Sequence, residues 1–348
     1  MNYFCLEENL NRGKGHISNN DTSKLSAMRP TASGTVNVIE RFGVLFVLVI
    51  VLVSFSLALP HTFFTQANFD TIISSQSAIL LLVLASAFPL RTGNFDISVA
   101  NVMIFSGTVM GVCSINHHWP ILAAVLLGMV AAGVCGIVNG FLVVVIGIDS
   151  LVATLGMSTV YAGISYALTN TQVLSGFSPG LERFAQIDFL NLPGAVWAGW
   201  ALAIVVWVVF EFVPFGRKLL FIGGNRQASQ LVGLPVRRLI FTSFVLASLI
   251  AGVAGMILAG SLGSLDPTSG TSYLLPPLAA VFLGAATIQV GRINIVGAVI
   301  AMYLLAAGVT GLELFGASDW VSQVFQGATL VVAVGVSSII RVRRRSAG

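Results

Sequence analysis

Charged side chains are scarce in this chain of 348 residues. Asp, Glu, Lys and Arg together make up 9% of it, whereas hydrophobic residues make up 56%. A soluble globular domain carries about 25% charged residues. The scarcity therefore excludes an ordinary soluble domain, and we infer that most of the chain is surrounded by lipid.

Signatures of catalysis and metal binding are also lacking. The sequence contains no Gly-x-x-x-x-Gly-Lys-Ser/Thr phosphate loop and no His-Glu-x-x-His pair. Its three cysteines, Cys5, Cys113 and Cys135, match neither a disulfide framework nor a metal-binding spacing. We therefore predict that the chain is not an enzyme and binds no cofactor itself.

Long apolar runs dominate what is present. A helix that crosses a bilayer needs about 20 mostly apolar residues. About ten such runs are found, at 41–59, 70–90, 95–115, 119–147, 150–169, 195–212, 239–260, 274–290, 294–311 and 320–338. The predicted fold class is an all-α polytopic membrane protein with about ten transmembrane helices.

Positive charge is distributed unequally between the connections of these runs. If the amino terminus is cytoplasmic, sixteen of the 17 Lys and Arg residues lie on the cytoplasmic side and only Arg183 lies outside. This bias is typical of cytoplasmic loops. It predicts a multi-pass protein with both termini in the cytoplasm, a polar tail over 1–40, a transmembrane domain over 41–340 and a basic tail over 341–348. Spread over cytoplasmic rims, the basic residues favour anionic lipid and not nucleic acid as their partner.

A polar, basic connection over 213–238 divides the runs into two blocks of four, at about 70–169 and 239–338. The first block begins outside and the second begins inside, so a shared structure would relate them by inversion, as in many transporters. This inference is topological, because no convincing repeat is visible residue by residue.

Residues that interrupt helices gather at two junctions. They are Pro89, Gly93 and Asn94 before the third run, and Pro267, Gly270, Pro276 and Pro277 before the eighth. Irregular backbone survives in a membrane only where protein or a water-filled cavity satisfies its polar groups. The junctions either line and gate a translocation path or form ordinary turns at the membrane rim.

Glycines recur at four-residue spacing, for example Gly107 with Gly111 and Gly136 with Gly140. Small residues let membrane helices approach closely. The spacing predicts helix packing in preference to a ligand site.

The connection over 213–238 has a local pattern of its own. Gly223 and Gly224 permit a tight turn, and Asn225 is a favourable cap for the segment that follows. Residues 226–232 are predicted to form a short helix that ends at Gly233. Such a helix is either a docking point for a partner or part of a simple linker.

At this connection the sequence resembles the permeases of ribose and related sugar ABC importers, within the branched-chain amino acid and ribose permease superfamily. Those permeases carry Leu-Gly-Arg followed by Gly-Gly-Asn-x-x-Ala-Ala-x-x-Ser-Gly-Ile. The chain matches with Phe215-Gly216-Arg217 and Gly223-Gly224-Asn225, and Val232-Gly233-Leu234 replaces Ser-Gly-Ile. In the family this segment is the coupling helix that contacts the ATPase. The resemblance implies that role for Gly223, Gly224, Asn225, Ala228 and Gly233.

A second match lies at the first junction. The family reads Gly-Ile/Phe-Asp-Leu-Ser-Val-Gly, and this chain reads Asn94-Phe95-Asp96-Ile97-Ser98-Val99-Ala100. Asn94 and Ala100 replace the flanking glycines. The resemblance implies a broken helix on the translocation path, formed by Asn94, Phe95, Asp96 and Ser98. Asp96 either orders this break through backbone N–H groups or binds the transported solute.

Two further matches are similar but weaker. Residues 150–155 resemble the Phe-Ile-Ala-Thr-Leu start of a family helix. Residues 273–287 resemble a Tyr-Glu-Leu-Asp-Ala-Ile run in which both acids are replaced here, by Leu274 and Pro276. Pro276 and Pro277 at this second junction are predicted to belong to the path.

The resemblance implies a permease similar to those of type II ABC importers, in the bacterial inner membrane, that imports a monosaccharide or related small polar solute. It also implies three partners: an ATPase that holds ATP and Mg²⁺, a periplasmic substrate-binding protein, and a second permease copy or paralogue. Two alternatives remain. A secondary carrier driven by an ion gradient would need paired ionisable groups near the midplane, and a membrane scaffold would leave the broken helices unexplained.

Overall fold

The computed structural model describes residues 34–346, and these are almost entirely helical. The chain divides into two units, Met1–Ile39 and Glu40–Gly348, and the architecture that follows is that of the second unit. Its strands form two ladders of two residues each. β1 (Leu174–Ser175) pairs with β4 (Ser264–Leu265), and β2 (Asp188–Phe189) pairs with β3 (Leu192–Pro193). The prediction of an all-α protein is confirmed for the described residues.

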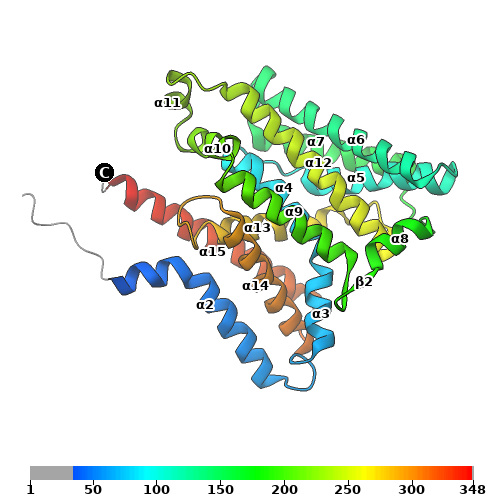
Figure 1. Cartoon of the computed structure of the whole chain (residues 1–348), viewed down its shortest axis with the longest axis horizontal. Coiled ribbons are helices and arrows are strands. Elements are labelled where there is room, and N and C mark those ends of the chain that lie inside the picture. The colour runs from blue at the N-terminus through cyan, green and yellow to red at the C-terminus, as the bar shows by residue number, and fades with distance from the viewer. Residues whose placement is uncertain (1–33, 347–348) are drawn as a thin grey trace, which may run out of the picture. The chain divides into compact units, whose positions relative to one another are not determined.

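Figure 1 shows the order of the helices along the chain. They are α2 (Gly34–Ala58), α3 (Gln66–Ser75), α4 (Ser77–Arg91), α5 (Val99–Gly111) continued by the π-helical η1 (Val112–Asn116), α6 (Ile121–Phe141) continued by η2 (Leu142–Ile146), α7 (Ser150–Thr169), α8 (Pro179–Gln186), α9 (Gly194–Glu211), α10 (Pro214–Gly224), α11 (Arg226–Leu231), α12 (Val236–Leu262), the 3₁₀-helix η3 (Ser269–Tyr273), α13 (Leu275–Gly284), α14 (Ile295–Leu314) and α15 (Asp319–Ser346).

Six of these helices are long and apolar enough to cross a membrane: 99–116, 121–146, 150–169, 194–211, 236–262 and 295–314. A seventh span results if α3 and α4, which meet at a bend of 40°, are taken together. These spans agree with seven of the predicted runs to within a few residues. The predicted number of ten is not confirmed, because α2 has only a short apolar part over 42–58 and neither α13 nor α15 qualifies.

The run over 274–290 is not a continuous helix, and that prediction was wrong. α13 ends at Gly284 because the side chain of Asn294 occupies the region beyond it. Asn294 Nδ2 donates to the carbonyl oxygens of Gly284 and Thr287, both at 3.1 Å. Ile288 and Gly291 then adopt positive φ, of 58° and 83°. Carbonyls that end a helix need such partners, and here a side chain supplies them.

Close packing of glycines holds the core helices together. A Cβ on Gly136 of α6 would lie 2.7 Å from the Cα of Val245 in α12, and one on Gly107 of α5 would lie 2.8 Å from the side chain of Leu265. Real Cβ atoms are not found that close to other heavy atoms. The predicted packing role of these glycines is confirmed, and it brings the backbones of α5, α6 and α12 close together.

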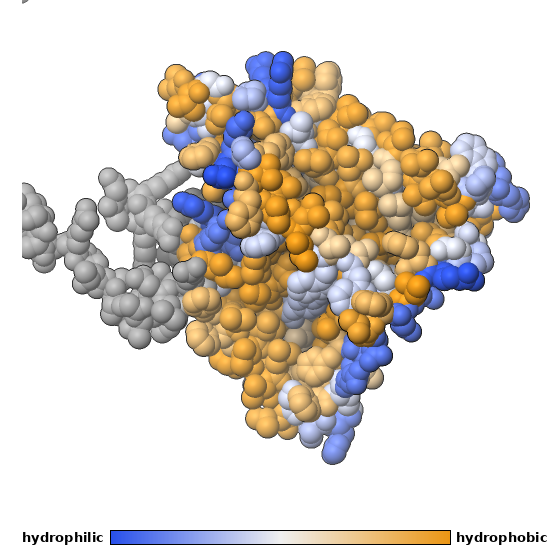
Figure 2. Space-filling view, viewed as in Figure 1, coloured by the Kyte–Doolittle hydropathy of each residue, from blue (hydrophilic) through white to orange (hydrophobic). Residues whose placement is uncertain are grey.

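The outer surface is largely apolar. Leu122 and Val130 of α6 and Val152 of α7 are 69%, 60% and 63% exposed, and Figure 2 shows apolar side chains over much of the visible face with hydrophilic ones gathered toward its edges. Soluble monomers rarely expose apolar patches of this extent. A lipid environment accounts for it.

Most of the predicted amino-terminal tail over 1–40 lies outside the described residues. α2 begins at Gly34, so the last residues of that predicted tail are helical, and α15 extends to Ser346 through most of the predicted tail over 341–348.

Candidate functional site

The predicted coupling segment forms two short helices, α10 and α11. Asn225 between them has extended backbone (φ −155°, ψ 103°), and its Oδ1 accepts a hydrogen bond from Ala228 N at 3.0 Å. Ser229 Oγ donates to the Asn225 carbonyl oxygen at 2.8 Å. Gly233, just after α11, has φ of +80°. The capped short helix predicted over 226–232 is confirmed.

The predicted tight turn at Gly223 and Gly224 was wrong, because both residues belong to the last turn of α10. Gly223 instead permits a close approach. A Cβ on it would overlap the carbonyl oxygen of Arg91 and would lie 3.4 Å from Gly93 N. Gly224 has no such neighbour within 4 Å among the described residues. Gly223 therefore lets the coupling segment pack against the end of α4.

Residues 92–98, between α4 and α5, form an irregular segment that we name the first break. Thr92 Oγ1 donates to the Pro89 carbonyl oxygen at 2.7 Å, and Asn94 Nδ2 donates to Thr92 Oγ1 at 2.7 Å. The Phe95 and Ile97 N–H groups donate to Ser150 Oγ and Thr154 Oγ1 of α7, at 3.0 and 3.1 Å. The interruption predicted at Gly93 and Asn94 is present between α4 and α5, and side chains satisfy part of its backbone.

Asp96 is 1% exposed and organises the end of the first break. Its Oδ1 accepts from Ser98 N at 2.9 Å and from Ser98 Oγ at 2.6 Å. Asn139 Nδ2 donates to Ser98 Oγ at 2.7 Å, and Tyr161 OH donates to Asn139 Oδ1 at 3.0 Å. Asp96 Oδ2 has no hydrogen-bond partner among the described residues. These contacts favour an ordering role over solute binding.

Arg91 is a candidate site residue that sequence reasoning missed, since it was counted only as a cytoplasmic charge. It is 4% exposed. Its Nη1 donates to the Ile293 carbonyl oxygen at 3.2 Å, and its Nη2 donates to the Phe210 carbonyl oxygen at 3.1 Å. The guanidinium also lies 4.2 Å from the centre of the Phe210 ring. Arg91 thus joins α4 to the end of α9 and to the turn before α14. Its position directly before Thr92-Gly93 was the available signal.

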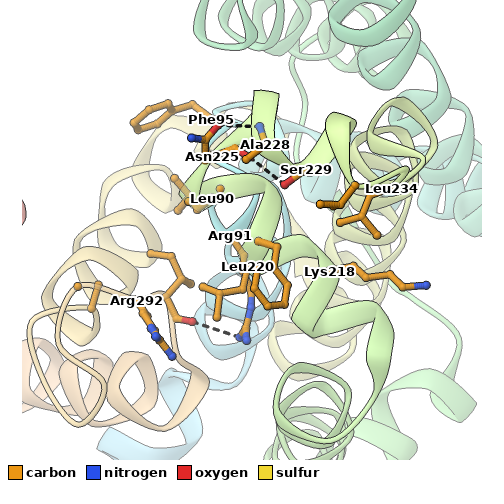
Figure 3. Close-up of a pocket in the computed structure, with 18 of the residues that line it drawn as sticks. Leu90, Arg91, Phe95, Lys218, Leu220, Asn225, Ala228, Ser229, Leu234 and Arg292 are labelled. Carbon is orange, nitrogen blue, oxygen red and sulfur yellow. Dashed lines mark hydrogen bonds between the residues drawn. The ribbon is translucent and has the colours of Figure 1, made fainter. Parts of the chain in front are cut away.

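A cavity of about 1000 Å³ lies where the first break, the coupling segment and residues 282–293 meet (Figure 3). Of the predicted site residues, it is lined by Phe95, Gly223, Gly224, Asn225 and Ala228. One residue of the predicted path, Phe95, therefore lines the same cavity as the predicted coupling residues. The ring centres of Phe95 and Phe282 are 5.9 Å apart and close one side.

The lining of this cavity is apolar and basic. Arg91, Lys218 and Arg292 contribute to it, and none of the described residues that line it is acidic. Lys218 points away from the centre of the cavity in Figure 3. Asn94, Asp96, Ser98 and Gly233 lie outside it.

A second cavity, of about 240 Å³, lies at the bend between α3 and α4. Pro276 lines it, whereas Pro277 does not and is buried in α13. Its polar lining consists of Ser75, Gln76, Thr310, Glu313 and Gln326. The sequence marked Pro276 but gave no reason to associate it with these side chains, which come from the bend between α3 and α4, from α14 and from α15.

A second break, over 263–268 between α12 and η3, repeats the turn of the first. Thr268 N and Thr268 Oγ1 donate to Asp266 Oδ1 at 2.8 and 2.7 Å, as Ser98 does to Asp96. Gly263 and Gly93 both have positive φ, of 63° and 81°. The two breaks thus match position by position at a distance of 170 residues: 263 corresponds to 93, 266 to 96 and 268 to 98. The matched segments are Gly93-Asn-Phe-Asp-Ile-Ser98 and Gly263-Ser-Leu-Asp-Pro-Thr268. This repeat was present in the sequence and was missed.

Comparison with known proteins identifies the family of this chain. The family described as branched-chain amino acid transport system / permease component matches residues 68–334. The L-arabinose ABC transporter permease protein AraH of Azospirillum brasilense is 30% identical over 320 residues, which are 90% of this chain and 92% of that protein. The ribose import permease protein RbsC of Bacillus subtilis is 29% identical over 299 residues, which are 85% and 92% of the two chains.

Among solved structures, PsaBC from Streptococcus pneumoniae in complex with Fab matches with a TM-score of 0.41 and 15% identity, covering 83% of this chain and 94% of that one. The family match extends over more than half of the chain and includes both breaks and the coupling segment. This chain therefore belongs to the family of branched-chain amino acid transport system permease components.

Proposed function

We propose that this permease imports a monosaccharide or a related small polar solute with energy from a separate ATPase. The relatives named above are permeases for L-arabinose and ribose, and D-allose transport system permease protein AlsC of Escherichia coli is 25% identical over 301 residues. The observation that carries the coupling role is the packing of Gly223 on the Arg91 carbonyl, which joins the coupling segment to the first break.

In this proposal the ATPase partner docks on α11 and holds ATP and Mg²⁺, and the permease binds no cofactor. A movement of α11 passes through α10 to Arg91 and the first break, because Gly223 leaves no space between α10 and that backbone. Arg91 extends the movement to α9 and to the turn before α14. A movement of α11 thus displaces three segments together: the first break, the end of α9 and the turn before α14.

We further propose ten membrane crossings, in two inverted blocks of four, with both termini cytoplasmic. The repeated turns support the blocks, since a shift of 170 residues carries the first break onto the second. The same shift carries α6 onto α14 and α7 onto the first part of α15. In this scheme α13 and the turn after it together make the eighth crossing.

The translocation path is proposed to pass the two breaks and the second cavity. Carboxylate and carboxamide groups such as those of Glu313, Gln76 and Gln326 are suited to hydrogen bonding with the hydroxyl groups of a sugar. Asp96 and Ser98 hold the first break in shape rather than contacting the solute. The expected partners are a second permease copy or paralogue and a periplasmic binding protein, in a bacterial inner membrane.

Reconstitution in liposomes tests the proposal. Uptake of a labelled monosaccharide is expected only when the permease, its ATPase, the loaded binding protein and ATP are all present. An ATPase without its catalytic glutamate is the matched control and should give no uptake. If the permease alone moves the sugar in response to an ion gradient, the chain is a secondary carrier and the proposal is wrong.

A further inference from the structure

We propose that α7 is a rigid link that makes the two breaks move together, with Ser150 and Thr154 as positioning residues. This inference rests on the proposed function and adds to it the part of the permease that couples one side of the path to the other. The two breaks both adjoin α5, at different points along it. The first directly precedes Val99, and Leu265 of the second packs on Gly107.

The beginning of α7 holds the first break. Ser150 and Thr154 lie one turn apart and are 8% and 0% exposed. Their hydroxyl oxygens accept the N–H groups of Phe95 and Ile97 at 3.0 and 3.1 Å. Buried backbone donors are costly to leave unpaired. The first break is therefore held where α7 places these two hydroxyls.

The segment just after α7 holds the second break. The chain leaves α7 through Asn170 and Thr171, both with positive φ, and enters β1. β1 pairs with β4, in the register Leu174 with Leu265 and Ser175 with Ser264. Ser264 and Leu265 are the two residues before Asp266 of the second break. α7 is thus bonded directly to the backbone of the first break and is connected through β1 to the backbone of the second break.

The middle of α7 is hydrogen-bonded to α5. Asn101 of α5 donates from Nδ2 to Ser158 Oγ at 2.7 Å. Its Oδ1 faces Gly270 of η3, where an added Cβ would overlap that oxygen. Asn101 therefore keeps η3, just past the second break, in register with α7. Ser150, Thr154 and Ser158 are spaced four residues apart and form one polar face of the helix.

The rest of α7 is held on one side, where Tyr161 OH donates to the Cys135 carbonyl oxygen and to Asn139 Oδ1 of α6, and its other side is exposed. Its 20 residues contain no proline and extend about 30 Å at 1.5 Å per residue. A Cβ added to Gly156 or Gly163, on its exposed side, would meet no atom of another segment within 4 Å among the described residues. A displacement of the first break by the coupling segment therefore moves α7, and β1 carries it to the second break.

Two valine substitutions on the same helix test this link. Thr154→Val keeps the shape of the side chain and removes the acceptor for Ile97 N. Thr159→Val is the matched control, because Thr159 is exposed and its hydroxyl bonds only to Leu155 of its own helix among the described residues. The reporter is Ser264→Cys next to the second break, labelled with a membrane-impermeant maleimide. The labelling rate is measured without nucleotide and with ATP bound to a hydrolysis-deficient ATPase.

ATP is expected to change the labelling rate of the Ser264→Cys reporter equally in two proteins: the one that carries Ser264→Cys alone and the one that also carries Thr159→Val. In the Thr154→Val variant this ATP-dependent change should shrink by about fivefold, the factor that loss of one hydrogen bond of ordinary strength produces. ATPase activity without solute should persist. Ser150→Ala, which removes the acceptor for Phe95 N, should act in the same direction and covers the case in which Thr154→Val fails to assemble.

An unchanged response in both Thr154→Val and Ser150→Ala would overturn the inference, as would an equal loss in Thr159→Val. The failure of the proposed function looks different. In that case the permease that carries Ser264→Cys, with Ser150 and Thr154 intact, would show no ATP-driven uptake. Its maleimide labelling rate would also not depend on ATP.

Discussion

Gly223 lies directly on the backbone carbonyl of Arg91, so closely that a Cβ at position 223 would overlap the oxygen. Arg91 in turn donates to the carbonyls at Phe210 and Ile293. The coupling segment therefore rests on a residue that is itself fastened to two other segments. Movement of α10 cannot be absorbed locally, because protein interiors are close-packed and transmit strain.

The first prediction concerns this contact. Gly223→Ala should lower the uptake per ATP hydrolysed by about tenfold, because overpacking of a tight contact costs about 1–3 kcal/mol and α10 must move away from Arg91. Gly224→Ala is the control, since the described structure leaves space there. Both ratios are measured in liposomes. Equal behaviour of the two variants would contradict the role given to the contact.

The second prediction concerns the Arg91 side chain. Arg91→Lys should lower the thermal stability of the permease in detergent, because an ammonium cannot reach two carbonyls and stack on Phe210 at once. Loss of one hydrogen bond from a charged donor corresponds to about 1.5–3 kcal/mol. Arg217→Lys serves as the comparison, since Arg217 is exposed and donates to Phe212 alone among the described residues. A melting temperature that Arg91→Lys leaves unchanged would argue against the role of Arg91 in joining α4 to the end of α9 and to the turn before α14.

The third prediction separates the two roles open to Asp96. Asp96→Asn should retain most uptake, because an amide oxygen accepts from Ser98 as Oδ1 now does. Asp96→Ala should lose uptake, since it leaves those donors unpaired. The same contrast is expected for Asp266→Asn and Asp266→Ala in the second break. If Asp96→Asn abolishes uptake while the protein stays folded, the carboxylate has a direct role in the path.

The fourth prediction concerns the end of the coupling helix. Gly233 has φ of +80°, a conformation that costs other residues about 1–2 kcal/mol. Gly233→Trp should uncouple ATP hydrolysis from uptake without loss of protein from the membrane. Gly316→Trp is the matched control, with φ of +87° and no atom within 4 Å in the described structure, outside the coupling segment. Unchanged uptake in Gly233→Trp would remove the coupling assignment.

The fifth prediction concerns the second cavity. Glu313→Gln and Gln326→Leu should each lower the maximal rate of uptake by about tenfold or more, the scale of a lost charge-assisted hydrogen bond, while basal ATP hydrolysis persists. Gln323→Leu lies on the same helix as Gln326, outside the cavity, and should have little effect. Uptake as fast in Gln326→Leu as in the control would place the path elsewhere.

Several features of the site were predictable because they depend on neighbours in the chain. Asn225 as a cap, Gly233 as a helix end and the break after α4 follow from side-chain size, hydrogen-bonding groups and backbone freedom over a few residues. The turn expected at Gly223 and Gly224 was wrong for the complementary reason. Glycine permits either a turn or a close approach, and only the position of Arg91 distinguishes them.

The repeat that relates the two breaks was only partly predictable from the sequence. Its pattern was visible in the letters, yet glycine, aspartate and a hydroxyl residue in six positions recur too easily to be convincing. Identical hydrogen bonds at Asp96 and Asp266 make the correspondence physical. The end of α13 had no comparable signal, since Asn294 acts from ten residues beyond Gly284.

The sequence by itself determined that this chain is a helical membrane protein, because apolar length and capping are summed over local stretches, and its short motifs carried the resemblance to sugar permeases. Only the tertiary structure decided that Arg91 lies against Gly223, that α13 stops short, and that α7 and the β1 strand after it contact the first and the second break. Those outcomes depend on contacts between residues from 10 to more than 200 positions apart, from Asn294 with Gly284 to Arg91 with Ile293. Packing alone selects which distant groups meet.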